Sequence, residues 1–170
     1  MKRLLTLAVC LCLMIGLKAQ DSEGSGYSSA VGLHLADQWG VTYKMGYKGS
    51  TSSYLNFIGT FKSEKDLFTA IGLIGLFEKH NDIGKVAGLR WYYGAGPNIG
   101  FISYDADIDS QITLGLTPVA GLDYKFKKFP VNLSLDYKPN LSIYAGEFNV
   151  DFFWKPVDEL INLSVRYTLN

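Results

Sequence analysis

The sequence of 170 residues predicts an all-β protein, an eight-stranded antiparallel up-and-down transmembrane β-barrel that follows a cleavable signal peptide. Three observations predict this fold. Apolar and polar residues alternate through most of the chain, an export signal opens it, and no later stretch is apolar enough for a transmembrane helix.

The alternation is clearest near the C-terminus. From Val131 to Ile143 every odd position is apolar or proline and every even position is polar, and residues 161–169 repeat the pattern. Because successive side chains on a strand point to opposite faces, each segment has one apolar wall and one polar wall. The apolar wall would face the core of a soluble protein, but it would face lipid in an outer-membrane barrel.

The signal peptide is expected to cover residues 1–19. Lys2 and Arg3 precede an apolar stretch that ends at Leu17, and Ala19 supplies the small residue at the cut. Both cysteines lie in this segment, so the exported chain has no thiol for a disulfide, a zinc–thiolate site or cysteine catalysis. Three of the 16 basic residues lie there too, which leaves 13 against 16 acidic residues and no basic footprint for nucleic acid.

The remaining chain divides into a flexible Ser/Gly-rich lead-in over residues 20–29 and a barrel over residues 30–170. Strands are expected at 31–36, 41–48, 55–62, 67–78, 86–103, 112–126, 131–143 and 161–169. The fourth of these is apolar on both faces, and Ile58 breaks the alternation of the third. Residues 80–85 are expected to form a turn, and residues 144–160 the last outer loop or an extra hairpin.

Three prolines, Pro97, Pro118 and Pro139, interrupt the predicted strands. Each lies about 9–12 residues from the periplasmic end of its strand, which is about the length that crosses a membrane. We therefore expect all three near the outer rim, where a missing backbone donor is tolerated best.

The charged residues of the strands favour a lipid-facing apolar wall. They share the polar face with most strand glycines, and small residues suit a narrow lumen. Aromatic residues stand at the ends of the apolar face, as in interfacial girdles: Tyr43, Tyr47, Trp91, Tyr93, Tyr124, Phe126 and Tyr167. Alternation alone is symmetric, so a secreted soluble barrel that binds an apolar ligand is the alternative.

Inward charges of both signs predict an interior ion-pair network of Lys44, Arg90, Asp123, Asp136, Lys138 and Arg166. An eight-stranded barrel is just wide enough inside for side chains. An unpaired charge in that space would be costly, so these groups are expected to pair. They either brace the barrel or gate a narrow water path.

Three segments carry a family resemblance: GLRWYYGAG at 88–96, SLDYKP at 134–139 and LSVRYTL at 163–169. They resemble the small outer-membrane β-barrel proteins of OmpA/OmpX-like type. The resemblance implies that the last strand is recognised by the barrel-assembly machinery, through Val165, Tyr167 and Leu169. That family usually ends in an aromatic residue, whereas Leu169 and then Asn170 close this chain.

The expected role is that of a monomeric protein of the Gram-negative cell outer membrane, in contact with its lipid and with the assembly machinery during biogenesis. The sequence predicts a structural or surface-interaction function without catalysis, metal or cofactor, and a narrow water or ion pore is the alternative. Only two histidines are present, His34 and His80, and neither is expected beside a serine that could complete a catalytic triad.

Overall fold

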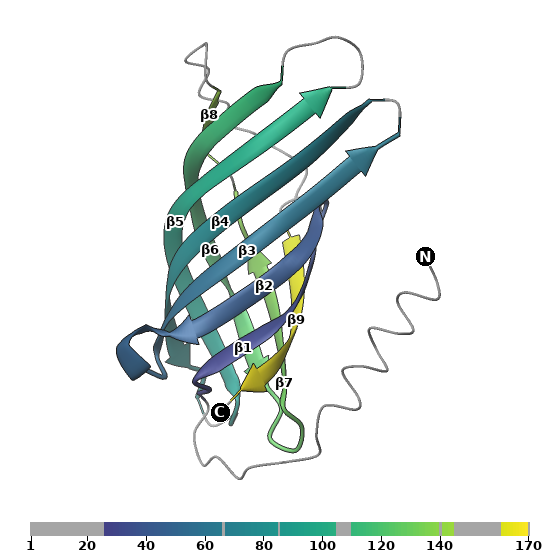
Figure 1. Ribbon diagram of the computed structural model, residues 1–170. Helices are drawn as coiled ribbons and strands as arrows, with labels where there is room; N and C mark the ends of the chain where they lie inside the picture. The colour runs from purple at the N-terminus through teal and green to yellow at the C-terminus, as the bar shows by residue number, and fades with distance from the viewer. Residues whose placement is uncertain are drawn as a thin grey trace.

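The computed structural model describes residues 26–65, 67–84, 86–104, 110–139, 141–144 and 161–169, which form one closed antiparallel barrel (Figure 1). Its strands are β1 (Ser29–Leu35), β2 (Trp39–Gly46), β3 (Ser53–Glu64), β4 (Phe68–Asp82), β5 (Leu89–Tyr104), β6 (Gln111–Lys125), β7 (Val131–Tyr137), β8 (Leu141–Tyr144) and β9 (Ile161–Leu169). The predicted all-β, up-and-down barrel is confirmed.

Strands β7 and β8 occupy a single position in the barrel. Both pair with β6 in one continuous register, in which Tyr137 faces Ala120 and Leu141 faces Leu116. The break between them contains Pro139. The nine segments therefore make the eight strands that the sequence predicts.

Pairing of the first strand with the last closes the barrel. Val31 on β1 faces Tyr167 on β9, and the Ser28 hydroxyl donates a hydrogen bond of 2.7 Å to the Leu169 carbonyl beside this seam. We call the end where β1 begins and β9 ends the lower end. Closure leaves neither the first nor the last strand as a free sheet edge.

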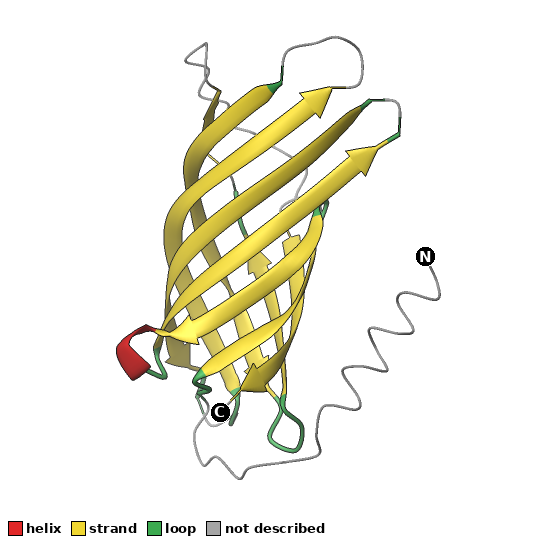
Figure 2. Ribbon diagram, viewed as in Figure 1, coloured by secondary structure: helices red, strands yellow, loops and turns green. Residues whose placement is uncertain are grey.

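The barrel wall has unequal height. Strands β3 to β6 are 12 to 16 residues long, whereas β1 and β2 have 7 and 8 residues. Figure 2 shows the long strands rising well above the β1–β2 hairpin at the upper end. Lys62 of the long strand β3 forms an ion pair of 2.9 Å with Asp37, which lies in the turn of the shorter β1–β2 hairpin.

The prolines do not lie at the upper rim, so that expectation is wrong. Pro97 and Pro118 stand in the middle of β5 and β6, facing Leu116 and Ala95 of the partner strand. Strands β5 and β6 continue well beyond the length that a bilayer requires, and β8 continues after Pro139. The expectation was wrong because it assumed that each strand ends where the bilayer ends.

The outer wall is apolar, and large hydrophobic side chains of β1 to β7 and of β9 are exposed on it. They include Val41, Phe57, Leu73, Trp91, Ile99, Leu114, Leu135 and Val165. Tyr43, Tyr47, Trp91 and Tyr93 are exposed near the lower end, as the sequence predicts. No helix among the described residues is long and apolar enough to cross a membrane.

Inward-facing glycines allow neighbouring strands to approach closely as the sheet curls. A Cβ placed on Gly96 would lie only 1.7 Å from the Gly75 carbonyl oxygen, and one on Gly94 would lie 2.1 Å from the Phe77 carbonyl oxygen. A Cβ on Gly32 meets the Val165 carbonyl oxygen at 2.0 Å. These glycines are thus required by the neighbouring backbone as well as by the narrow lumen.

We expect Gly96→Ala to lower the yield of folded barrel, because the added methyl group forces the β4 and β5 backbones apart at a cost of about 1–3 kcal/mol. Gly75→Ala is the matched control, since its Cβ would meet Phe57 at an ordinary 3.8 Å. Refolding in detergent followed by unheated and heated gel electrophoresis measures both. Equal folded fractions for the two variants would contradict the close-approach argument.

Candidate functional site

The polar side chains of the barrel interior form the candidate site. Alternation places one face of every strand inward, and all six residues of the predicted network are buried there: Lys44, Arg90, Asp123, Asp136, Lys138 and Arg166. The structure brings five of them into ion pairs, in two groups. It also adds Glu78, which the sequence analysis did not assign to the interior.

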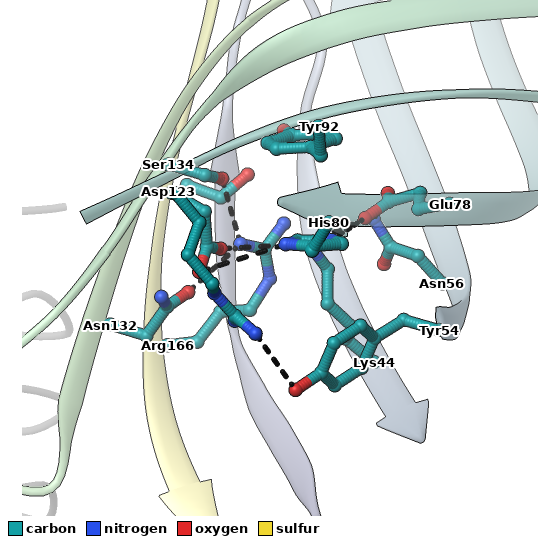
Figure 3. A network of polar contacts seen from close by, with 12 residues as sticks. Lys44, Tyr54, Asn56, Glu78, His80, Tyr92, Asp123, Asn132, Ser134 and Arg166 are labelled. Carbon is teal, nitrogen blue, oxygen red and sulfur yellow. Dashed lines mark hydrogen bonds and ion pairs between the residues drawn. The ribbon is translucent and has the colours of Figure 1, made fainter. Parts of the chain in front are cut away.

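The first group crosses the lower half of the lumen (Figure 3). Lys44 Nζ of β2 lies 2.7 Å from Glu78 Oε2 of β4 and 3.7 Å from Asp123 Oδ1 of β6. Arg90 Nη2 of β5 lies 2.9 Å from Asp123 Oδ2. Because β2, β4 and β6 are not neighbours in the sheet, the two ion pairs of Lys44 brace the barrel across the lumen, whereas Arg90 and Asp123 face each other on the paired strands β5 and β6.

Glu78 has three polar partners in this group. Besides Lys44, it accepts a hydrogen bond of 2.7 Å from Asn56 Nδ2, and His80 Nε2 lies 3.0 Å from its second oxygen. The expectation that His80 lies in a turn is wrong, because β4 continues to Asp82 and His80 is buried beside Tyr92, stacked at 4.6 Å between ring centroids. Glu78 and His80 lie two residues apart and therefore point to the same face of β4.

The second group is centred on Asp136 of β7. Lys138 Nζ lies 2.8 Å from Asp136 Oδ1, and the Tyr92 hydroxyl donates a hydrogen bond of 2.6 Å to Asp136 Oδ2. Tyr92 belongs to β5, two strands away, so this bond is a second brace across the lumen.

Arg166 differs from the other predicted network residues. Its Nε donates to Thr42 Oγ1 at 3.2 Å, and its Nη1 donates to Ser134 Oγ at 2.7 Å and to Asn132 Oδ1 at 3.3 Å. No carboxylate of the described residues lies within 4.0 Å of it. The expected pairing of Arg166 with an interior aspartate is therefore wrong.

An apolar cluster occupies the lumen beside the charged groups. The cluster takes one residue from each of the four successive strands β3 to β6: Ile58, Leu76, Tyr92 and Val119. Ile74 of β4 packs against this cluster. Ile58 is the residue that broke the alternation of its segment in the sequence, and Leu76 belongs to the segment that was apolar on both faces. Both irregularities arise because part of this lumen is apolar.

The residues just before β1 cover the lower end of the lumen. Tyr27, expected in the flexible lead-in, is instead buried, and its hydroxyl lies 3.3 Å from Asp123 Oδ1. The Tyr54 hydroxyl donates to the Tyr27 carbonyl at 2.9 Å, and the Arg90 guanidinium lies 5.3 Å from the centre of both tyrosine rings. Lys125 Nζ also donates to the Gly26 carbonyl at 3.2 Å. We call this arrangement the lower seal.

A serine does lie beside a histidine, contrary to the sequence-based expectation. His34 Nδ1 is 3.1 Å from Ser164 Oγ, across the β1–β9 pairing. Both side chains are buried in the lumen, and the hydroxyl-bearing Ser164 has no exposed surface. The described residues contain no group of three or more potential metal ligands.

The narrow barrel, its apolar outer wall and its closed antiparallel register define the class of fold, which is a closed eight-stranded antiparallel β-barrel. Among solved structures, the chain is similar to the N-terminal β-barrel domain of OprF from Pseudomonas aeruginosa, with a TM-score of 0.58 and 19% sequence identity. The match covers 85% of this chain and 99% of that one. At 19% identity the similarity concerns the fold alone. The predicted resemblance is therefore confirmed for the fold.

Models of known protein families do not match the chain, and neither does any curated protein sequence. The three residues of the predicted assembly signal, Val165, Tyr167 and Leu169, all lie on the outward face of β9, and their recognition remains a prediction. The predicted signal peptide, with both cysteines, lies outside the described residues. Of the loop or extra hairpin expected at 144–160, only Tyr144 is described, as the last residue of β8.

We expect Glu78→Gln to destabilise the barrel by about 3–5 kcal/mol, because it leaves the buried Lys44 without its closest counter-charge. Adding Lys44→Met should restore part of the loss, since the unpaired charge is then removed. Urea unfolding in detergent measures both, and the exposed Glu64→Gln is the control, with an expected change of about 0.5 kcal/mol or less. A Glu78 variant as stable as that control would show that the ion pair is unimportant.

Proposed function

We propose that the exported chain is a monomeric integral protein of the outer membrane whose barrel is closed to solutes and serves a structural or surface-interaction role. The observation that carries this proposal is the filling of the lumen. Charged braces, the apolar cluster of β3 to β6 and the lower seal all lie inside the barrel.

The outer wall supports the membrane location. Its exposed side chains are large and apolar on every long strand, and a soluble protein rarely exposes so extensive an apolar surface. The lipid of the outer membrane is the solvent that matches this wall. The outward residues of β9 suit recognition by the barrel-assembly machinery during biogenesis.

The burial of the candidate catalytic groups supports a role without catalysis. Ser164 and His34 are the nearest approach to a nucleophile and base, yet both lie among packed inward side chains. A catalytic pair requires a site beside it where the reacting group of a substrate can lie. The hydrogen bond is better explained as mutual satisfaction of two buried polar groups.

The membrane location predicts that the mature protein requires detergent. After refolding, it should be monodisperse only in detergent and should migrate differently in unheated and heated gel samples, because the barrel resists the detergent of the gel until it is heated. A protein that stays monodisperse without detergent would instead support a secreted soluble barrel with an apolar ligand.

The closed lumen predicts no discrete single-channel steps in planar bilayers. The measurement uses refolded protein whose insertion is verified by gel shift, with a known open porin as the positive control in the same bilayers. Reproducible steps from the unmodified protein would overturn the closed-barrel proposal and support the narrow water or ion pore.

A further inference from the structure

The buried charges of the lumen do not balance. Five buried cationic side chains, of Lys44, Arg90, Lys125, Lys138 and Arg166, stand against three buried carboxylates among the described residues. Each carboxylate has one close cationic partner: Glu78 pairs with Lys44, Asp123 with Arg90 and Asp136 with Lys138, all within 2.9 Å. Lys125 donates to a carbonyl at the lower end, whereas Arg166 is deeply buried and has no carboxylate of the described residues within 4.0 Å.

Hydrogen-bond donors without a partner lie around the same residue. Arg166 Nη2 and Asn132 Nδ2 are both buried and unpaired in the described part of the barrel. Asn132 of β7 faces Arg166 directly in the strand register, and Arg166 Nη1 donates to its Oδ1. Thr168 is the next inward residue of β9, and its buried hydroxyl is unpaired as well.

Buried polar groups of folded proteins are rarely left unsatisfied, and a buried charge without a counter-charge is costlier still. The unpaired groups here are one guanidinium nitrogen, one amide nitrogen and one hydroxyl, each of which can donate a hydrogen bond. They belong to the adjacent strands β7 and β9. A neutral acceptor such as water would satisfy their hydrogen bonds but would place no counter-charge beside Arg166, which has no carboxylate of the described residues within 4.0 Å. A small anion satisfies both requirements.

We propose that the lower lumen contains a buried binding site for a monovalent anion of the halide class, formed by Arg166 and Asn132 with Thr168 beside them. A halide has no directional bonding pattern of its own, so it can accept from donors on two adjacent strands. Its single negative charge matches that of Arg166, the deeply buried cation without a close carboxylate among the described residues. The anion is then a structural component of the barrel, enclosed when the lower seal forms.

The first experiment refolds the full mature protein in detergent with sodium chloride, sodium bromide or sodium gluconate at equal ionic strength. We expect chloride and bromide to raise the temperature at which half of the protein loses its gel shift by about 3–5 °C relative to gluconate. Crystals grown in bromide should show one anomalous peak beside Arg166. Equal melting temperatures in all three salts, with no bromide peak, would overturn the proposal and assign the donors to water.

Asn132→Asp tests the site without removing a side chain. The new carboxylate faces Arg166 in place of the amide, so it supplies a permanent counter-charge. We expect this variant to be at least as stable as the unmodified protein and to lose the stabilisation by chloride.

Asn98→Asp is the matched control, because Asn98 faces inward on β5 beside Thr117, away from the Arg166 cluster. It should keep the chloride response. A chloride response that survives in Asn132→Asp, or disappears equally in both variants, would overturn the assignment to Arg166.

Discussion

The ion pairs around Glu78 and Asp123 are the constraint on which the rest of this barrel depends. Through Lys44 they join β2 to β4 and to β6 across the lumen, whereas backbone pairing joins only neighbouring strands. Charges of this kind are stable away from water only when each has a partner close by. The barrel must therefore be narrow enough for Lys44 of one wall to reach the carboxylates of the other.

Narrowness in turn requires the strands to curl tightly. The inward glycines make this possible, because at Gly96 and Gly94 the backbone of the next strand lies where a methyl group would be. Removing side chains at these positions leaves the remaining inward residues to fill the lumen, which they do with ion pairs on one side and the Ile58 cluster on another. Curvature and interior chemistry thus depend on each other.

The strands and their two faces could be predicted from the sequence, because alternation is a local property that each segment shows by itself. The pairing inside the lumen could not, because it joins residues far apart in the chain, and Arg166 was accordingly expected to meet a carboxylate that it does not meet. The predicted end of β4 was also wrong, because the inward polar residues Glu78 and His80 resemble the residues of a turn. The sequence showed Ile58 as an exception to the alternation. Its role in an apolar cluster could not be predicted, because the cluster also needs residues from three other strands.

The lower seal has a consequence for the order in which the chain folds. Tyr27 lies at the beginning of the described chain, yet its partners Tyr54 and Asp123 are 27 and 96 residues further along. Its buried position is complete only when β3 and β6 are both in place. The segment that stands first in the described chain is therefore among the last to reach its final position, and protection of this segment from proteases marks a finished barrel.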